Sequence, residues 1–195
     1  MKFHPGFQRL AKPFCLAYDH IKYNYTIIGR ENIPEGGCIL IANHSQWADP
    51  VLIATALGPK HDIVAMAKKE LFEIKPLKPL IEALGAFPVD RGRADINAIK
   101  LSLKAVRDGR KLLIFPEGTT KHKEGDEAKE GAARIALKTG APILPIYVSE
   151  NKKFRSKVYV VIGEPFVPEP TRSKEGYRKL ANDMMVRVYA LKEQC

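Results

Sequence analysis

An apolar run that stops abruptly at a polar turn is the feature that most constrains how this chain can fold. The run covers residues 39–42, the turn begins with Asn43-His44, and Asp49-Pro50 opens a second apolar segment. A buried strand, a polar turn and a helix start follow one another in this order in α/β proteins, which bind ligands beyond the carboxyl ends of their strands. The stretch therefore predicts an α/β fold with a candidate site at His44.

The spacing of His44 and Asp49 indicates how the turn is built. Four residues separate them, and on a continuous helix this offset would place the side chains about 140° apart. Asp is a good N-cap and Pro a good first helical residue, so we expect Asp49 to cap a helix over 51–57 and to reach the imidazole. A histidine held by a carboxylate is suited to be a general base. The alternative is a hydrogen-bonded turn histidine beside an unrelated N-cap.

Strand and helix patterns alternate along the rest of the chain, without repeats or an evident linker. This alternation predicts an α/β class with one mixed, mainly parallel sheet flanked by helices, in a single domain over residues 25–195. The expected strands are 25–28, 38–42, 62–67, 86–89, 111–115, 143–148 and 158–162. The expected helices after the first turn are 80–84, 96–106, 126–139 and 177–191.

Residues 1–24 form a separate amphipathic helical segment in this prediction. Apolar side chains recur at close to helical spacing, whereas basic residues lie on other faces of the helix. Such a helix lies in a membrane interface or packs on its own domain, and the sequence leaves both alternatives open. Charges and prolines interrupt any apolar run, so we expect neither a signal peptide nor a membrane-spanning helix. The apolar residues are Phe7, Leu10, Phe14, Tyr18 and Ile21.

The charge balance restricts the possible partners. Lys and Arg total 32 against 22 Asp and Glu, which gives a net charge of +10. This excess favours an anionic membrane face, a phosphorylated small molecule or nucleic acid. The basic residues do not cluster and no aromatic–basic pattern of an RNA-binding sheet occurs, so we expect no nucleic-acid partner. The three cysteines lie far apart without metal-ligand spacing, which predicts no metal site and a reducing compartment.

Two further loops directly follow expected strands, Asp90–Arg93 and Pro116–Thr120. Arg91 is suited to bind a phosphate with two hydrogen bonds, and Glu117 to hold a substrate hydroxyl. Gly118 would let the backbone approach a ligand closely. Taken singly, an arginine such as Arg91 is more often a solvated surface residue, and a glutamate such as Glu117 is more often a turn acid. No serine or cysteine lies in a nucleophile-elbow context, and no glycine-rich phosphate loop is present.

Four blocks in this order resemble those of the glycerolipid acyltransferases, and most of all the 1-acylglycerol-3-phosphate (lysophosphatidic acid) acyltransferases. The resemblance extends over about residues 27–168, with linking pieces at 67–72 and 129–134. The blocks are Asn43-His44 with Asp49, Gly85-Ala86-Phe87-Pro88-Val89-Asp90-Arg91, Phe115-Pro116-Glu117-Gly118-Thr119 and Ala141-Pro142-Ile143-Leu144-Pro145.

The resemblance implies a reaction and roles for these residues. His44, oriented by Asp49, would take the proton of a glycerol hydroxyl, which then attacks the thioester of acyl-CoA or acyl-carrier-protein without an acyl-enzyme or a cofactor. The acceptor phosphate would be held by Arg91 and by Lys68 or Lys69. The glycerol site would be lined by Glu117, Gly118 and Thr119. Structural residues near the acyl donor would be Pro142 and Pro145.

One position departs from the family pattern. An arginine often follows the Gly-Thr of the third block, but Thr120 stands here, followed by Lys121-His122-Lys123. The acceptor is therefore lysophosphatidic acid or another lyso-lipid, such as a lysophospholipid or an amino-acid lipid, and a catalytically silent lipid-binding relative is a further alternative. The free cysteines and soluble acyl donors predict a cytoplasmic enzyme bound peripherally to the anionic inner face of the cell membrane.

Overall fold

The computed structural model describes residues 4–90, 95–120 and 128–195. Its seven strands form one sheet in the order β1-β7-β6-β2-β5-β3-β4. Strands β6, β2, β5, β3 and β4 are parallel, β7 is antiparallel to β6, and β1 is parallel to β7. The prediction of a mixed, mainly parallel sheet is confirmed. The strands are β1 (Asn24–Ile28), β2 (Cys38–Ala42), β3 (Ile63–Lys68), β4 (Ala86–Val89), β5 (Lys111–Ile114), β6 (Ile143–Val148) and β7 (Lys157–Ile162).

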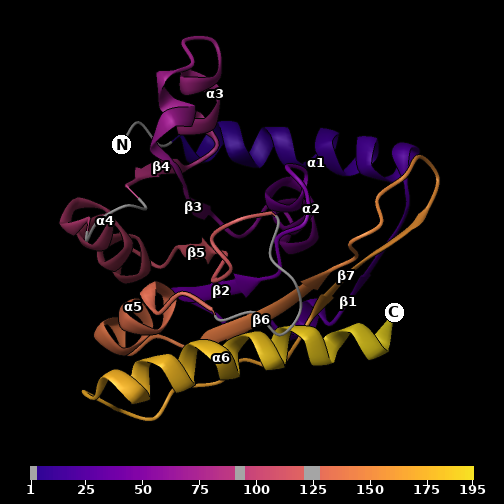
Figure 1. Cartoon of the computed structure of the whole chain (residues 1–195). Helices are drawn as coiled ribbons and strands as arrows, with labels where there is room; N and C mark the ends of the chain where they lie inside the picture. Colours follow the sequence, from indigo (N-terminus) through magenta and orange to yellow (C-terminus); the bar gives the residue numbers. More distant parts are fainter. Residues whose placement is uncertain (1–3, 91–94, 121–127) are drawn as a thin grey trace.

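Helices cover both faces of the sheet (Figure 1). Helices α1 and α2 lie on one face, α4, α5 and α6 cover the other, and α3 lies beside β4 at one end. The α-helices are α1 (Pro5–Lys22), α2 (Asp49–Leu57), α3 (Leu77–Ala83), α4 (Ile96–Arg107), α5 (Gly131–Thr139) and α6 (Lys174–Ala190). Short 3-10 helices are η1 (Arg30–Asn32), η2 (Lys69–Glu73) and η3 (Leu191–Gln194).

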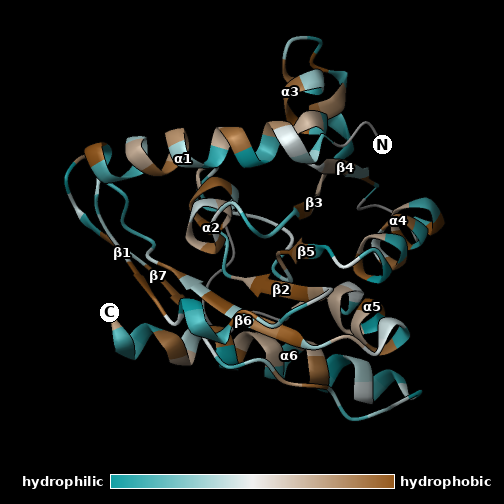
Figure 2. Ribbon diagram, turned by 180° about the vertical axis from the view of Figure 1, so that it is seen from behind, coloured by the Kyte–Doolittle hydropathy of each residue, from teal (hydrophilic) through white to brown (hydrophobic). Residues whose placement is uncertain are grey.

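Strand β2 is the centre of the fold because both of its faces are buried. Every residue from Cys38 to Ala42 is fully inaccessible to solvent. Leu40 packs with α2 in one core cluster, whereas Ile41 packs with the opposite layer of helices. Because both faces are buried, the sequence of β2 is apolar throughout and does not alternate with polar residues. Figure 2 shows the hydrophobic colouring along β2 and β6. Since β5 and β6 flank β2 in parallel, their carboxyl ends meet at one edge.

The helix expected over 126–139 begins later than the sequence predicts. Residues 126–127 lie outside the described part, and α5 begins only at Gly131. The backbone N–H of Lys129 donates to Pro116 O at 2.9 Å, and that of Ala128 donates to the Asn182 side chain. The Lys129 bond replaces the i to i−4 bond that the expected helix would have there, so residues 128–130 form a connection that lies against the loop after β5.

Helix α1 packs on its own domain through its polar side. Gln8, Lys12 and Asp19 are buried against the rest of the protein, and their side chains hydrogen-bond to the segment around 55–63. The apolar stripe expected from the sequence is exposed instead, at Phe7, Leu10, Phe14, Tyr18 and Ile21. Among the described residues, no helix is long and apolar enough to cross a membrane.

Candidate active site

The loop after β2 is fixed to the neighbouring strand by Asn43. Its amide Nδ2 donates to Val148 O and its Oδ1 accepts from Val148 N, both at 2.8 Å. The Asn43 side chain therefore continues the pairing with β6 where the main chain of β2 leaves the sheet. This arrangement orients the next residue, His44, over the carboxyl edge.

His44 and Asp49 form a hydrogen-bonded pair. Nδ1 of His44 lies 2.9 Å from Oδ2 of Asp49, which is completely buried. An ionised carboxylate only accepts hydrogen bonds, so Nδ1 carries the proton and Nε2 retains its lone pair. The imidazole also stacks on Phe115 with ring centroids 4.0 Å apart. The predicted pair is thus brought together in the geometry that a general base needs.

Asp49 achieves this in a different way from the predicted one. It is the first residue of α2, and Ala48 occupies the N-cap position. Instead of capping the helix, Oδ2 accepts from the backbone N–H groups of Ser45 and Gln46 at 2.7 and 2.8 Å. The carboxylate turns back into the preceding loop and closes it around the imidazole, so the N-cap expectation was wrong while the contact was right.

The surroundings keep Asp49 ionised. Burial raises the pKa of the Asp49 carboxyl, but the hydrogen bond with His44 and the charge of Lys152 lower it by more, so that the pKa lies below its usual value. The ammonium of Lys152 is 2.7 Å from Asp49 Oδ1. Sequence reasoning missed Lys152, because the only signal was its position just after β6, whose carboxyl end lies beside that of β2.

Glu117 is buried and binds the backbone of His44. Its Oε2 accepts from the backbone N–H of His44 at 2.8 Å, and its Oε1 accepts from Tyr189 OH at 2.7 Å. The third loop and α6 therefore help to position the first loop. Tyr189 belongs to this contact set and was not foreseen from the sequence.

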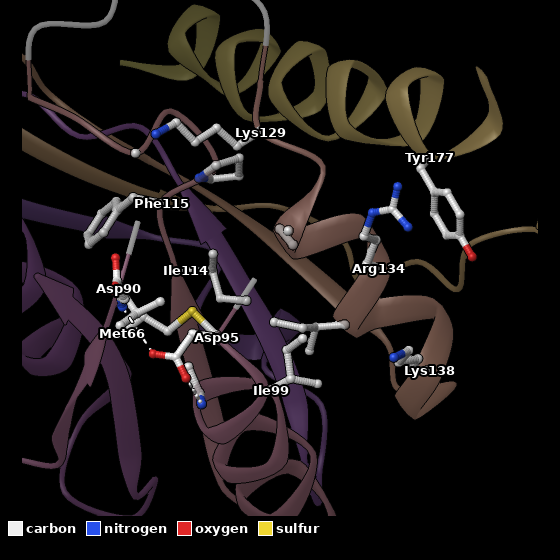
Figure 3. Close-up of a pocket in the computed structure, with 17 residues that line it drawn as sticks. Met66, Asp90, Asp95, Ile99, Ile114, Phe115, Lys129, Arg134, Lys138 and Tyr177 are labelled. Atoms are coloured by element: carbon white, nitrogen blue, oxygen red, sulfur yellow. Dashed lines mark hydrogen bonds between the residues drawn. The ribbon is translucent and has the colours of Figure 1, made fainter. Parts of the chain in front are cut away.

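A pocket of about 360 Å³ lies next to Phe115, and His44 is not among the residues that line it. Phe115, which stacks on His44, also lines this pocket, and Figure 3 shows the apolar side chains of Met66, Ile99 and Ile114 gathered in it. Arg134 and Lys138 lie towards one end of the pocket and Lys129 towards another. Its lining thus combines an apolar interior with cationic groups and with the carboxylates of Asp90 and Asp95.

The other predicted residues that the structure describes lie around the same edge. Gly118 lines the pocket with a φ of 68°, and a Cβ there would lie 2.8 Å from Lys129 Nζ. Lys68 ends β3 and pairs with Glu70 at 3.3 Å, while Lys69 begins η2. Thr119 is exposed directly after Gly118. Arg91 lies outside the described residues.

Pro145 lies within β6, whereas Pro142 directly precedes this strand, towards the edge of the sheet opposite to the His44 loop. Pro145 pairs with Ile41 in the sheet, and its carbonyl accepts from Gly163 N at 2.9 Å. Pro142 accepts from Ile39 N at 3.0 Å. Both belong to the packing around β2. Within the described residues, no group of three His, Cys, Asp or Glu side chains forms a candidate metal site.

Known proteins are similar to this chain in sequence and in fold. The acyltransferase family model matches residues 24–149. The 1-acyl-sn-glycerol-3-phosphate acyltransferase of Bacillus subtilis is 34% identical over 71% of this chain and 72% of its own length. That of Streptococcus pneumoniae is 32% identical over 80% of this chain and 61% of its own length.

A solved structure agrees with these sequence relatives. The crystal structure of the 1-acyl-sn-glycerophosphate (LPA) acyltransferase from Thermotoga maritima matches with a TM-score of 0.71 and 25% identity, over 96% of this chain and 78% of that one. The family match spans well over half of the 195 residues and includes the His44 loop and the Glu117 loop. The chain therefore belongs to the acyltransferase family.

Proposed function

We propose that this protein transfers a fatty acyl group from an acyl thioester to the free hydroxyl of 1-acylglycerol-3-phosphate, which yields phosphatidic acid. The observation that carries the proposal is the His44–Asp49 pair, joined through Phe115 to an apolar pocket. The relatives named above share the family and bear the name of this reaction.

The proposed chemistry has two proton movements and no covalent enzyme intermediate. Nε2 of His44 takes the proton of the acceptor hydroxyl while the hydroxyl oxygen attacks the thioester carbonyl carbon. The tetrahedral intermediate collapses with cleavage of the carbon–sulfur bond, and the leaving thiolate receives the proton from His44. Asp49 stabilises the imidazolium in between. The products are the ester and free CoA or carrier-protein thiol.

We assign the acyl chain to the pocket and the acceptor phosphate to cations near its mouth. The apolar lining suits a hydrocarbon chain. Lys129 lies against Gly118. Gly118 belongs to the loop in which Thr120 stands in place of the family arginine. Arg91 and Lys68 or Lys69 complete the phosphate site in this proposal. Gly118 and Thr119 line the glycerol site, with Glu117 holding the backbone of His44.

We also propose that the enzyme binds the anionic membrane surface from which a lyso-lipid comes. The exposed stripe of α1 supports this, because an exposed row of large apolar side chains on one helix face indicates a lipid or protein contact. The polar side of the same helix is already fixed to the domain. The net charge of +10 favours an anionic surface.

Thiol release from oleoyl-CoA, measured with and without 1-oleoylglycerol-3-phosphate, tests the reaction. We expect release that depends on the acceptor and that falls by about 10²–10⁴-fold in His44→Ala with unchanged folding. Normal turnover in His44→Ala would exclude the mechanism. Release without acceptor would indicate a thioesterase instead.

The donor and the acceptor are varied in the same assay. Turnover only with acyl-carrier-protein would identify that donor, and competition between lysophosphatidic acid, other lysophospholipids and lyso-amino-acid lipids would identify the acceptor. Lipid binding without turnover for every donor and acceptor would favour the catalytically silent relative.

A further inference from the structure

Lys152 is a buried cation in contact with Asp49 of the His44–Asp49 pair. It follows β6 in the loop that leads to β7, and its side chain is fully inaccessible to solvent. Nζ lies 2.7 Å from Asp49 Oδ1 and donates to Ser45 Oγ at 2.6 Å. A long charged side chain is rarely buried unless its charge is paired, so this contact needs a physical reason.

The two oxygens of Asp49 are used differently. Oδ2 is shared by Nδ1 of His44 and the N–H groups of Ser45 and Gln46. Oδ1 is buried and lies 2.7 Å from the Lys152 ammonium, so its charge is balanced there by the ion pair with Lys152. A buried carboxylate without a counter-ion tends to take up a proton.

We propose that Lys152 is a positioning residue that keeps Asp49 ionised and thereby keeps the proton of His44 on Nδ1. This inference rests on the proposed acyl transfer, in which Nε2 is the base. If Asp49 were protonated, its hydroxyl would donate to Nδ1 and the imidazole proton would move to Nε2. That tautomer has no lone pair at the position that faces the acceptor.

The neighbouring groups leave this role to Lys152. Glu117 approaches from the loop after β5, but its oxygens are bonded to the backbone N–H of His44 and to Tyr189 of α6. Phe115 contacts the imidazole as an uncharged ring. Among the described residues, Lys152 is the cation in direct contact with the Asp49 carboxylate. Its complete burial also argues against direct binding of a substrate phosphate.

Lys152→Met tests the inference, with Lys153→Met as the matched control. The methionine keeps the unbranched shape and most of the length of the side chain and removes the charge. Lys153 is the exposed neighbour in the same loop. We expect kcat to fall by about 10²-fold in Lys152→Met, since a wrong tautomer costs up to about 10⁴-fold in a serine protease triad. The KM for the acceptor stays unchanged, and Lys153→Met keeps the wild-type kcat.

The pH profile separates positioning from mere packing. Removal of a positive charge makes the His44–Asp49 pair easier to protonate, so the acidic limb of the kcat profile moves up by about one pH unit or more. An unchanged limb would overturn the proposal. A higher acceptor KM with unchanged kcat would also overturn it, because it would identify Lys152 as a substrate ligand.

A measurement without turnover distinguishes this inference from the reaction itself. The ¹⁵N spectrum of the five histidines, with His44 assigned by a His44→Gln variant, is expected to show the Nδ1–H tautomer in the wild type and its loss in Lys152→Met. If the wild type lacks turnover but shows this change, the proposed function fails and the role of Lys152 stands. If turnover is confirmed and both variants match the wild type, the role of Lys152 fails alone.

The wild type also provides a test that does not depend on the folding of a variant. The ¹³C shift of the Asp49 carboxyl carbon is expected to report an ionised group at pH 7. A protonated Asp49 in the wild type would overturn the proposal even if Lys152→Met did not fold.

Discussion

Two buried polar networks in this molecule have opposite designs. Under α1, Gln8 and Lys12 are bonded to backbone groups of the segment that follows α2. At the candidate active site, Asp49 and Lys152 form a buried ion pair, and Asp49 holds one nitrogen of His44. The first network joins a helix to its domain, whereas the second holds charge beside a nitrogen that remains open for chemistry.

The two networks differ in which groups lose their partner when one residue is replaced. Bonds from a neutral amide to backbone groups stabilise a fold modestly, and their loss leaves buried donors and acceptors unpaired. A buried ion pair contributes little net stability, but removal of one partner is costly because the other charge remains buried. We therefore expect single substitutions to act on folding alone under α1, and on folding and turnover together at the site.

The largest effect is expected for Asp49→Asn, which leaves Lys152 as an unpaired buried cation. We expect the free energy of unfolding to fall by about 3–5 kcal/mol and turnover to fall by about 10²-fold or more. Urea titration and thiol release measure the two. The double variant with Lys152→Met serves as the control, and it is expected to recover most of the stability but not the turnover. A loss below about 1 kcal/mol in the single variant would contradict the ion-pair argument.

Gln8→Ala tests the network under α1. It removes bonds from Nε2 to Ile63 O and Leu84 O at 2.7 and 2.9 Å, and the bond from Ile63 N to Oε1 at 2.9 Å. We expect a loss of about 2–3 kcal/mol in urea titration, because backbone groups of Ile63 are left unpaired. Turnover on dispersed short-chain substrates stays at the wild-type level, and a fall as large as that of Asp49→Asn would remove the distinction between the networks.

Arg9→Ala is the matched control for that variant. Arg9 follows Gln8 on α1 but forms an ion pair with Asp62 from a largely exposed position, at 3.1 Å. Exposed pairs contribute about 1 kcal/mol at most. A loss equal to that of Gln8→Ala would mean that α1 is held by its charges rather than by its buried amide.

The same contrast explains what the sequence could predict. The alternation of apolar and polar segments predicts which segments of the chain form strands. The spacing of His44 and Asp49 predicts that these two side chains form a hydrogen-bonded pair. Both predictions succeed because they depend on neighbours within a few residues. Lys152 is far from His44 in the chain and reaches Asp49 only because β6 lies beside β2. No local pattern marks such a residue.

The orientation of α1 illustrates the same limit. Helical periodicity correctly divided the segment into an apolar stripe and a polar side. It did not show which side packs inward, because the groups that receive Gln8 and Lys12 belong to residues 58–63 and 84. The N-cap expected at Asp49 failed similarly, since the loop N–H groups of Ser45 and Gln46 compete for the same oxygen.

Lys12 gives the network under α1 a measurable pH dependence. Burial lowers the pKa of Lys12 to about 8, with Asp62 opposing the shift and Arg9 adding to it. Between this pKa and the unfolded value of about 10.5 the unfolded chain binds more protons, so stability rises with pH in this window. Relative to Lys12→Met, we expect the wild type to gain about 2 kcal/mol between pH 7.5 and pH 10. Urea titrations of both proteins at several pH values measure this, and a constant difference would show that Lys12 is not desolvated in the folded state.

The last prediction concerns the outer, apolar face of the same helix and changes membrane binding rather than folding or turnover. Phe14 is 72% exposed, and its insertion into a bilayer would contribute about 1.5–3 kcal/mol. We expect Phe14→Gln to weaken sedimentation with phosphatidylglycerol vesicles about tenfold, while urea titration stays at the wild-type level. Val186→Gln is the matched control, because Val186 is 68% exposed on α6, across the sheet from α1 (Figure 1). Equal vesicle binding by both variants and the wild type would exclude α1 as the lipid contact. Complete release by high salt in the wild type would assign binding to the basic residues instead, because burial of an apolar side chain does not depend on ionic screening.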